Sequence, residues 1–257
     1  MFVIDEAGMI ASGQLARVID QIHAAGAKAV LVGDAMQLQP IQAGAAFRAI
    51  SERVGYVELE GIRRQRTHEW QRQASLDFAR GRTIEALQAY AARGSIRFHD
   101  TAETAHKQIV ADWADARRQG SVLILAHANK DVDALNAGVR AARKAVGELA
   151  GTEIQFQTSR GLKSFAVGDR VLFLKNERDV KNGMLGTVEG LGLDMLTVRT
   201  DRGDTVELKP SEYEHFSHGY AATVHKAQGA TVDRTLVYGS ALMDRHLGLC
   251  GPDASPR

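Results

Sequence analysis

The sequence predicts an α/β protein with parallel sheets covered by helices on both faces, and a small antiparallel β-barrel inserted into that layout. Short, wholly apolar strand candidates at residues 1–4, 29–32 and 122–125 alternate with helical segments, a pattern typical of buried parallel sheets. Between residues 151 and 215 the pattern changes to closely spaced short strands separated by turn residues. The length of 257 residues suits one large domain or two small ones.

Helical periodicity connects the apolar strands. The first helix is expected to begin at Ser12, a suitable N-cap, and to stop at Gly26, with an apolar face formed by Leu15, Val18, Ile19 and Ile22. Further helical patterns run over residues 44–53, from Gly61 through Tyr90, around Ile109 and Trp113, and over residues 130–146. Short strands are expected at residues 56–59, 96–98 and 235–238.

Three strand candidates define the inserted barrel: Val171–Leu174, Thr187–Glu189 and Met195–Val198. Turn residues separate them at Asn182-Gly183 and again at residues 201–204. Because a buried apolar strand returns at residue 235, we expect the barrel to interrupt the α/β layout rather than to end it.

Composition excludes several classes of protein. Hydrophobic residues make up 44% and charged residues 25% of the chain, which is usual for a globular protein and not for a disordered or disulfide-rich one. The net charge of +1 neither favours nor excludes a nucleic-acid partner. Cys250 is the single cysteine, so no internal disulfide is expected. The sequence has no apolar run long enough to span a bilayer and no signal-peptide pattern, and a cytoplasmic location is therefore expected. The nine histidines show no zinc spacing with that cysteine, so no structural metal is expected.

Two acidic residues directly follow the first apolar strand. Asp5 and Glu6 at the carboxyl end of a strand predict a Walker B site, in which Asp5 holds Mg²⁺ through water and Glu6 polarises the attacking water. A solvated acidic turn is the alternative, and this dipeptide alone would favour it.

The segment after the second strand strengthens the interpretation as a nucleotide site. Residues 33–40 follow that strand, and ligands bind at the carboxyl edge of a parallel sheet. There, Gln37 can hydrogen-bond a γ-phosphate or its attacking water without adding charge. Further along, Arg64 offers a guanidinium for transition-state charge. For other arginines of this region we expect only a solvated basic face, at Arg66, Arg72 and Arg82.

Residues 223–229 carry a hydroxyl, an imidazole, a lysine and an amide at an expected helix start. Such donors suit the phosphates of a single nucleic-acid strand. The alternative is that residues 223–229 are only a capped surface helix. The other segments described above make this alternative less favoured.

These segments together resemble the ordered motifs of superfamily 1 helicases. Motif II corresponds to residues 4–9, motif III to 33–40, motif IV to 62–65 and motif V to 223–229. Their order and spacing resemble the RecD-like branch. Details such as Asn129 and the run Gly168–Val171 are similar to the helicase region of TraA-type (Ti-type) conjugative relaxase-helicases. The resemblance covers about residues 1–247.

The resemblance implies an ATP-driven 5′-to-3′ DNA helicase, with single-stranded DNA and the conjugative transfer machinery as partners of the whole protein. It implies catalytic roles for Asp5, Glu6, Gln37 and Arg64. It implies that ATP and Mg²⁺ are bound by Asp5, Gly33, Asp34, Gln37, Arg64, Gln228 and Gly229, with Asp5 reaching Mg²⁺ through water. DNA contacts are implied for Thr223, His225 and Lys226.

The resemblance also implies a domain organisation. Residues 1–60 would be the C-terminal part of a first RecA-like domain, and residues 61–150 with 216–247 a second one. Residues 151–215 would be the inserted barrel, and residues 248–257 an aberrant tail.

The sequence departs from the family pattern in two places. It contains no Gly-x-x-x-x-Gly-Lys-Ser/Thr loop, so the phosphate-binding loop is expected upstream of Met1. Motif VI is absent after Leu247. One allowed coding of residues 249–257, read one nucleotide later, gives Tyr-Val-Ala-Arg-Thr-Arg, which indicates a frameshift near codon 248. We therefore expect a helicase fragment that does not hydrolyse ATP alone. The alternatives are an ATP-independent nucleic-acid-binding module and an inactive gene remnant.

Overall fold

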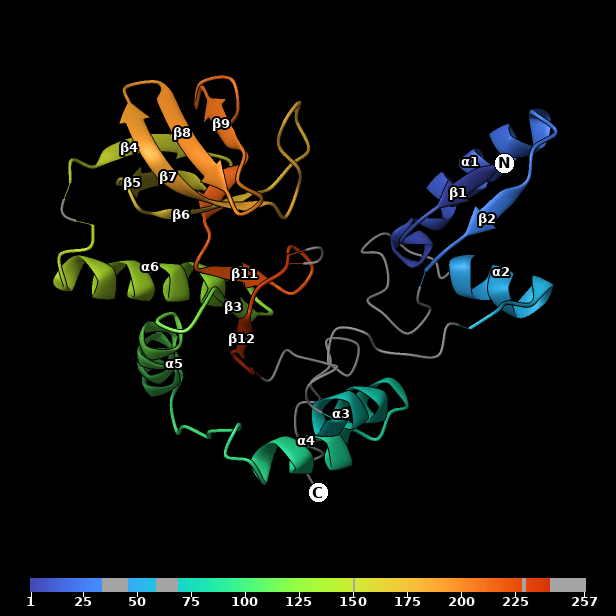
Figure 1. The fold of residues 1–257 in the computed structure, drawn as a ribbon, viewed down its shortest axis with the longest axis horizontal. Helices are drawn as coiled ribbons and strands as arrows, with labels where there is room; N and C mark the ends of the chain where they lie inside the picture. Colours follow the sequence, from blue (N-terminus) through green and yellow to red (C-terminus); the bar gives the residue numbers. More distant parts are fainter. Residues whose placement is uncertain (34–45, 59–68, 150, 228–229, 241–257) are drawn as a thin grey trace. The chain divides into compact units, whose positions relative to one another are not determined.

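The computed structural model describes residues 1–33, 46–58, 69–149, 151–227 and 230–240 (Figure 1). These residues form two compact units, one within residues 1–97 and the other within residues 98–242. Both units contain parallel strands joined by helices, as predicted. No helix in the described ranges is both long and apolar enough to cross a membrane.

The first unit contains a two-stranded parallel sheet. Strand β1 (Phe2–Ile4) pairs with β2 (Ala29–Leu31), helix α1 (Ser12–Ala24) connects them, and α2 (Ala46–Val54) follows. These strands were expected to be buried on both faces, and that prediction is wrong for both: in β1 Phe2 is 52% and Val3 60% exposed, and in β2 Val30 is 39% exposed. The described sheet has only these two strands, so each strand lacks a hydrogen-bonded neighbour on one side.

The predicted apolar face of helix α1 is buried only in part, because Val18 is 41% exposed. Leu15 and Ile22 are buried, and Gly26 adopts a φ of 59° just past the end of the helix. Ser12 is not the N-cap but the first helical residue. The N-cap is Ala11, which has no side chain able to accept a hydrogen bond from the first turn.

A helical hairpin of α3 (Glu69–Ala79) and α4 (Thr83–Ala91) completes the first unit. The expected continuous helix through Tyr90 is wrong, because the chain breaks at residues 80–82, where Gly81 adopts a φ of 77°. Arg82 was expected to be solvated, but it donates to the buried carboxylate of Asp77 at 2.9 Å.

Two short strands predicted in this region are absent. Residues 55–58 and 95–99 have no regular secondary structure, and residue 59 lies outside the described ranges. Val57 and Phe98 are each 91% exposed. Apolar residues alone do not make a strand when no neighbouring strand offers hydrogen bonds.

The second unit is built on a parallel sheet in the order β11-β3-β12. Its strands are β3 (Val122–Ala126), β11 (Ala221–Thr223) and β12 (Arg234–Val237), and its helices are α5 (Ala102–Ala116) and α6 (Asn129–Ala145). Helices and sheet share a core of Trp113, Ile124, Leu135, Val139 and Tyr220. The strand predicted at 122–125 and the helices predicted around it are therefore confirmed, and β11 was missed.

The predicted antiparallel insertion is present between α6 and β11 (Figure 1). Its strands are β4 (Ile154–Thr158), β5 (Gly161–Phe165), β6 (Arg170–Phe173), β7 (Leu185–Gly192), β8 (Met195–Thr200), β9 (Thr205–Leu208) and β10 (Phe216–His218). Five of them form a sheet in the order β10-β6-β7-β8-β9, and β4 and β5 form a separate hairpin. The hydrogen-bonded ladders of the described strands therefore do not close into the predicted barrel. The hairpin and the sheet nevertheless share one core, in which Phe156 and Phe165 meet Phe216.

A buried polar network fixes the insertion to helix α6 and strand β11. The fully buried carboxylate of Asp169 accepts hydrogen bonds from Arg140 Nε at 3.0 Å and from Tyr220 Oη at 2.7 Å. Burial and the neighbouring Asp169 carboxylate raise the pKa of Tyr220. The side chain of Asn136 accepts from the backbone N–H of Ala221 at 2.9 Å and donates to the carbonyl of the same residue at 3.0 Å. Helix α6 thereby holds the strand that leads into residues 223–229.

Candidate nucleotide and nucleic-acid sites

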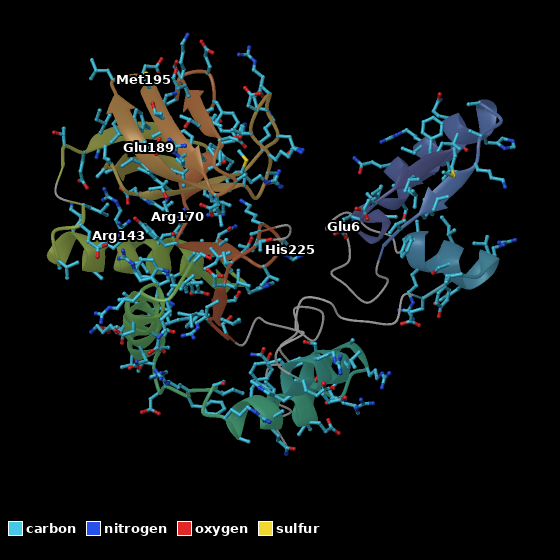
Figure 2. All side chains as sticks on the ribbon, in the orientation of Figure 1. Glu6, Arg143, Arg170, Glu189, Met195 and His225 are labelled. Carbon is cyan, nitrogen blue, oxygen red and sulfur yellow. The ribbon has the colours of Figure 1, made fainter. Side chains whose placement is uncertain are left out.

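The first candidate site lies where β1 ends. Asp5 and Glu6 form an exposed turn, and Glu6 adopts a left-handed conformation with φ 53° (Figure 2). The backbone N–H of Glu6 donates to Asp5 Oδ1 at 2.9 Å. Asp5 Oδ2 and the Glu6 carboxylate make no hydrogen bond within the part of the chain that the structure describes. Two unpaired carboxylates at a strand end can accept water or water-bound Mg²⁺.

Gly33 lies directly beside this turn. The N–H of Ala7 donates to the carbonyl of Val32 at 2.9 Å, which joins the ends of the two strands. A Cβ on Gly33 would lie 3.0 Å from the backbone nitrogen of Gly8, so this close approach favours glycine over residues with a side chain. The structure therefore brings Gly33 to Asp5 and Glu6. The other residues predicted for ATP, namely Asp34, Gln37, Arg64, Gln228 and Gly229, lie outside the described residues.

The second candidate site lies where β11 and β3 end. Thr223 is the last residue of β11 and is paired with Ala126 at the end of β3. The chain then forms a turn and not the expected helix start: the N–H groups of Lys226 and Ala227 both donate to the carbonyl of Thr223, each at 3.0 Å. Thr223 is buried, whereas His225 and Lys226 are partly exposed on the turn, where Figure 2 labels His225.

The β4–β5 hairpin brings two further cations near this turn, and helix α6 supplies the carboxylate that pairs with them. Lys163 Nζ lies 3.1 Å from Asp133 Oδ1, and Arg160 Nη1 lies 3.7 Å from the same oxygen. Arg160 also donates to the side-chain oxygen of Asn129 at the start of α6. Burial lowers the pKa of Lys226, and the positive charge of Arg160 lowers it further, while Asp133 opposes both effects. Arg160, Lys163 and Lys226 together are called the basic cluster below.

Sequence reasoning missed Arg160 and Lys163. They belong to a hairpin that was not predicted, and about sixty residues separate them from Lys226. Nothing in the local pattern of charges distinguishes them from other surface cations. The topology alone, which returns β11 beside β3 after the insertion, brings them to the same place.

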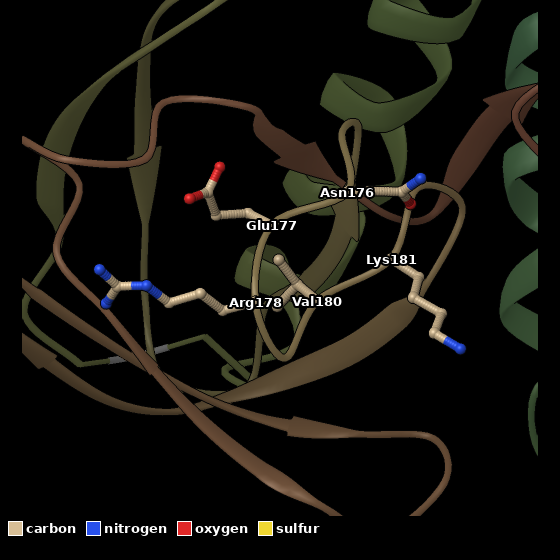
Figure 3. Close-up of a pocket in the computed structure, with 5 residues that line it drawn as sticks. All are labelled: Asn176, Glu177, Arg178, Val180 and Lys181. Carbon is tan, nitrogen blue, oxygen red and sulfur yellow. The ribbon is translucent and has the colours of Figure 1, made fainter.

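The loop between β6 and β7 encloses a shallow hollow lined by Asn176, Glu177, Arg178, Val180 and Lys181 (Figure 3). The charged ends of Glu177, Arg178 and Lys181 point away from one another. Because a ligand site needs several polar groups that converge, this hollow is not a candidate.

Comparisons with known proteins define the class. Residues 1–101 match the AAA domain family. The structure of Pif1 from Bacteroides bound to single-stranded DNA superposes with a TM-score of 0.62 at 19% identity, covering 95% of this chain and 66% of that chain. At this identity the likeness concerns the fold, and it confirms the predicted RecA-like α/β class.

Two relatives that resemble this chain over nearly its whole length are a conjugal transfer protein and a DNA helicase. The conjugal transfer protein TraA of Rhizobium radiobacter is 47% identical over 254 residues, which is 96% of this chain and 23% of that protein. The ATP-dependent RecD2 DNA helicase of Deinococcus radiodurans is 27% identical over 246 residues, 90% of this chain and 31% of that protein. Along nearly its whole length the chain is therefore similar to a segment of TraA and, at lower identity, to a segment of a RecD2 DNA helicase, the two kinds of protein that the sequence motifs resemble. It spans about a quarter of the length of TraA.

Proposed function

We propose that this chain is the helicase segment of a TraA-type conjugative relaxase, which uses ATP to move 5′-to-3′ along single-stranded DNA. The observation that carries this proposal is the 47% identity to TraA along nearly the whole chain. An alignment over 90% of the chain with a RecD2 DNA helicase supports it independently. The conjugative transfer machinery would be the partner of the whole protein.

The domain boundaries belong to the same proposal. Residues 1–60 would close the first RecA-like domain, residues 61–150 and 216–247 would form the second, residues 151–215 would be the inserted barrel, and residues 248–257 would be an aberrant tail. The shared core of hairpin and sheet supports a barrel-like insertion. The compact units divide at residue 97 and not at residue 60, so the first boundary rests on the resemblance.

The turn after β1 would serve ATP hydrolysis. Asp5 would hold Mg²⁺ through water and Glu6 would orient and polarise the attacking water. Bound Mg²⁺ would neutralise charge on the phosphates of ATP. Gly33 would let the phosphates approach the backbone. The remaining predicted contacts would come from Asp34, Gln37, Arg64, Gln228 and Gly229, with Gln37 placing the water and Arg64 stabilising the transition-state charge.

The turn after β11 would contact DNA. Thr223, His225 and Lys226 would bind backbone phosphates, because hydroxyl, imidazole and ammonium groups can all donate to them. Their place at the carboxyl edge of a parallel sheet supports this role, since ligands bind at that edge.

Two measurements test the proposal. Binding of a labelled oligothymidylate to the 257-residue chain tests the DNA site. Hydrolysis of ATP stimulated by single-stranded DNA is then measured in a TraA protein whose homologous segment has been replaced by this chain. Binding without hydrolysis in that chimera would favour an ATP-independent nucleic-acid-binding module, and absence of both would favour an inactive remnant.

A further inference from the structure

The basic cluster is assembled from three separate elements around one carboxylate. Arg160 lies in the turn between β4 and β5, Lys163 lies in β5, and Lys226 lies in the turn after β11. Asp133, on the first turns of α6, is the acidic partner of both hairpin cations. Two cations therefore pair with Asp133, and Lys226 lies near enough for Arg160 and Asp133 to shift its pKa in opposite directions. These four residues together carry an excess of positive charge.

Exposure differs between the two kinds of residue. The side chains of Arg160 and Lys163 are only 15% and 17% exposed, whereas that of Asp133 is 44% exposed. The cations are thus fixed and partly desolvated, and the carboxylate is the solvent-facing member. Because Asp133 faces solvent, another anion can replace it and become the partner of both cations, so that neither cation is left unpaired.

The start of α6 adds to the positive potential. This helix has 17 residues, and its N-cap, Ala128, makes no side-chain hydrogen bond to the first turn. Backbone N–H groups at a helix start favour anions, although Asp131 already places one carboxylate in the first turn of α6. Asn129, the first helical residue, is already held by Arg160, so the helix start and the cluster form one surface.

We propose that Asp133 occupies the position of a DNA phosphate: its carboxylate holds Arg160 and Lys163 in place in the free protein, and a phosphate of a strand bound at Lys226 displaces it. This inference rests on the proposed function and extends its DNA site to the inserted hairpin. A phosphodiester offers two non-bridging oxygens that share one negative charge, and these can contact the arginine and the neighbouring lysine separately, whereas both cations contact the same oxygen of Asp133. Preformed cations lower the entropy lost when the strand binds.

The test compares charge-matched variants of the full chain. Binding of fluorescein-labelled oligothymidylate is followed by anisotropy over a series of salt concentrations for wild type, Asp133→Asn, Arg160→Ala, Lys226→Ala and the double variant Asp133→Asn/Arg160→Ala. Glu189→Gln is the matched control, because Glu189 is also about two-fifths exposed, pairs with Arg199 at 2.7 Å and lies in the same insertion. It adds the same charge without touching the cluster.

Asp133→Asn should increase the affinity for the oligonucleotide about 2- to 5-fold, which corresponds to the free energy of one exposed ion pair. Glu189→Gln should leave the affinity nearly unchanged. Arg160→Ala should weaken binding and reduce the slope of log K against log salt by about 0.7, one phosphate contact of a single strand. The double variant should show no tightening over Arg160→Ala. Circular dichroism of each variant verifies that the chain is folded.

Three other outcomes would contradict the inference, and they differ in whether the proposed function fails with it. If Lys226→Ala weakens binding but Asp133→Asn behaves like Glu189→Gln, the displacement of Asp133 is overturned and the proposed function stands. If neither wild type nor Asp133→Asn binds DNA, the DNA site of the proposed function fails and this inference fails with it. If Asp133→Asn tightens a fluorescent ATP analogue instead of the oligonucleotide, the cluster is a nucleotide site and the inference is wrong.

Discussion

The two strand-end sites of this protein have the same architecture and opposite chemistry. In the first unit, the ends of β1 and β2 carry Asp5 and Glu6 on an exposed turn with no ion pair in the described structure. In the second unit, the ends of β11 and β3 lie beside a basic cluster that is partly buried. A parallel sheet therefore provides the place for a site, and the residues after each strand decide its charge.

The difference extends to how each site is held. The turn after β1 is held by the hydrogen bond from the Glu6 N–H to Asp5, by that from the Ala7 N–H to the Val32 carbonyl, and by the close approach at Gly33. The turn after β11 follows a strand fixed by Asn136 and by the buried Asp169. Exposed carboxylates are solvated by water, so few protein contacts are needed to hold them. Partly desolvated cations have lost this solvation and therefore need fixed partners of opposite charge.

The first prediction has the largest expected effect and concerns the acidic turn. In the TraA chimera, Glu6→Gln should lower ATP hydrolysis by about 10²- to 10⁴-fold, because an amide cannot take up a proton from the attacking water. Nucleotide binding should change little. Both quantities are measured by a phosphate-release assay and by titration with a fluorescent ATP analogue.

Two arginines provide the matched comparison in the same chimera. Arg64→Ala should lower kcat by up to about 10³-fold, the low end for an arginine finger. Arg72→Ala should have almost no effect, because Arg72 pairs with the exposed Glu69 on the surface of α3. A larger effect of Arg72 than of Arg64 would show that the motif has been assigned wrongly.

The second prediction concerns the support of the basic turn. Asp169→Ala should reduce the free energy of unfolding of the second unit by about 3–5 kcal/mol, since it removes the buried carboxylate that pairs with Arg140 and leaves that arginine only the partly exposed Glu153. Trp113 is buried in this unit and Trp70 lies in the first. Urea unfolding followed by fluorescence in a Trp70→Phe background therefore reports on the second unit, with Glu189→Gln as control. A loss similar to that of the control would mean that the network does not support β11.

Sequence reasoning predicted the strand-end sites better than their surroundings. Asp5 and Glu6 stand directly after an apolar strand, so sequence order alone places them at a sheet edge. Thr223 was selected by its motif instead, because β11, the strand that it ends, was not predicted. The strands expected at 56–59 and 96–98 failed because pairing depends on neighbours that are distant in sequence. Arg160 and Asp133 escaped notice for the same reason: their contact joins a hairpin turn to a helix and leaves no local pattern.

The third prediction compares salt dependence at the basic turn with sequence preference. Lys226→Ala should weaken binding of the chain to single-stranded DNA about 10-fold and to a similar extent for unrelated sequences, because phosphate contacts carry no base information. Fluorescence anisotropy with homopolymeric and mixed oligonucleotides checks this. A loss confined to one sequence would contradict a phosphate contact.

The last prediction has the smallest effect and uses the helix starts of the two units. In α5 the N-cap Thr101 accepts a hydrogen bond from the N–H of Thr104 at 3.1 Å. In α1 the N-cap Ala11 has the extended backbone of a cap, with φ −61° and ψ 143°, but no side-chain acceptor. The first unit therefore begins its helix without a stabilising contact that the second unit has.

Thr101→Ala should cost the second unit about 1 kcal/mol, the usual weight of such a cap, and Thr101→Ser should cost almost nothing. Ala11→Ser should stabilise the first unit by about 0.5 kcal/mol, because the hydroxyl can accept from an N–H of the first turn. Urea unfolding followed by Trp113 in the Trp70→Phe background, and by Trp70 in a Trp113→Phe background, separates the two units. Equal small losses for Thr101→Ala and Thr101→Ser would show that packing, and not the cap, stabilises the start of α5.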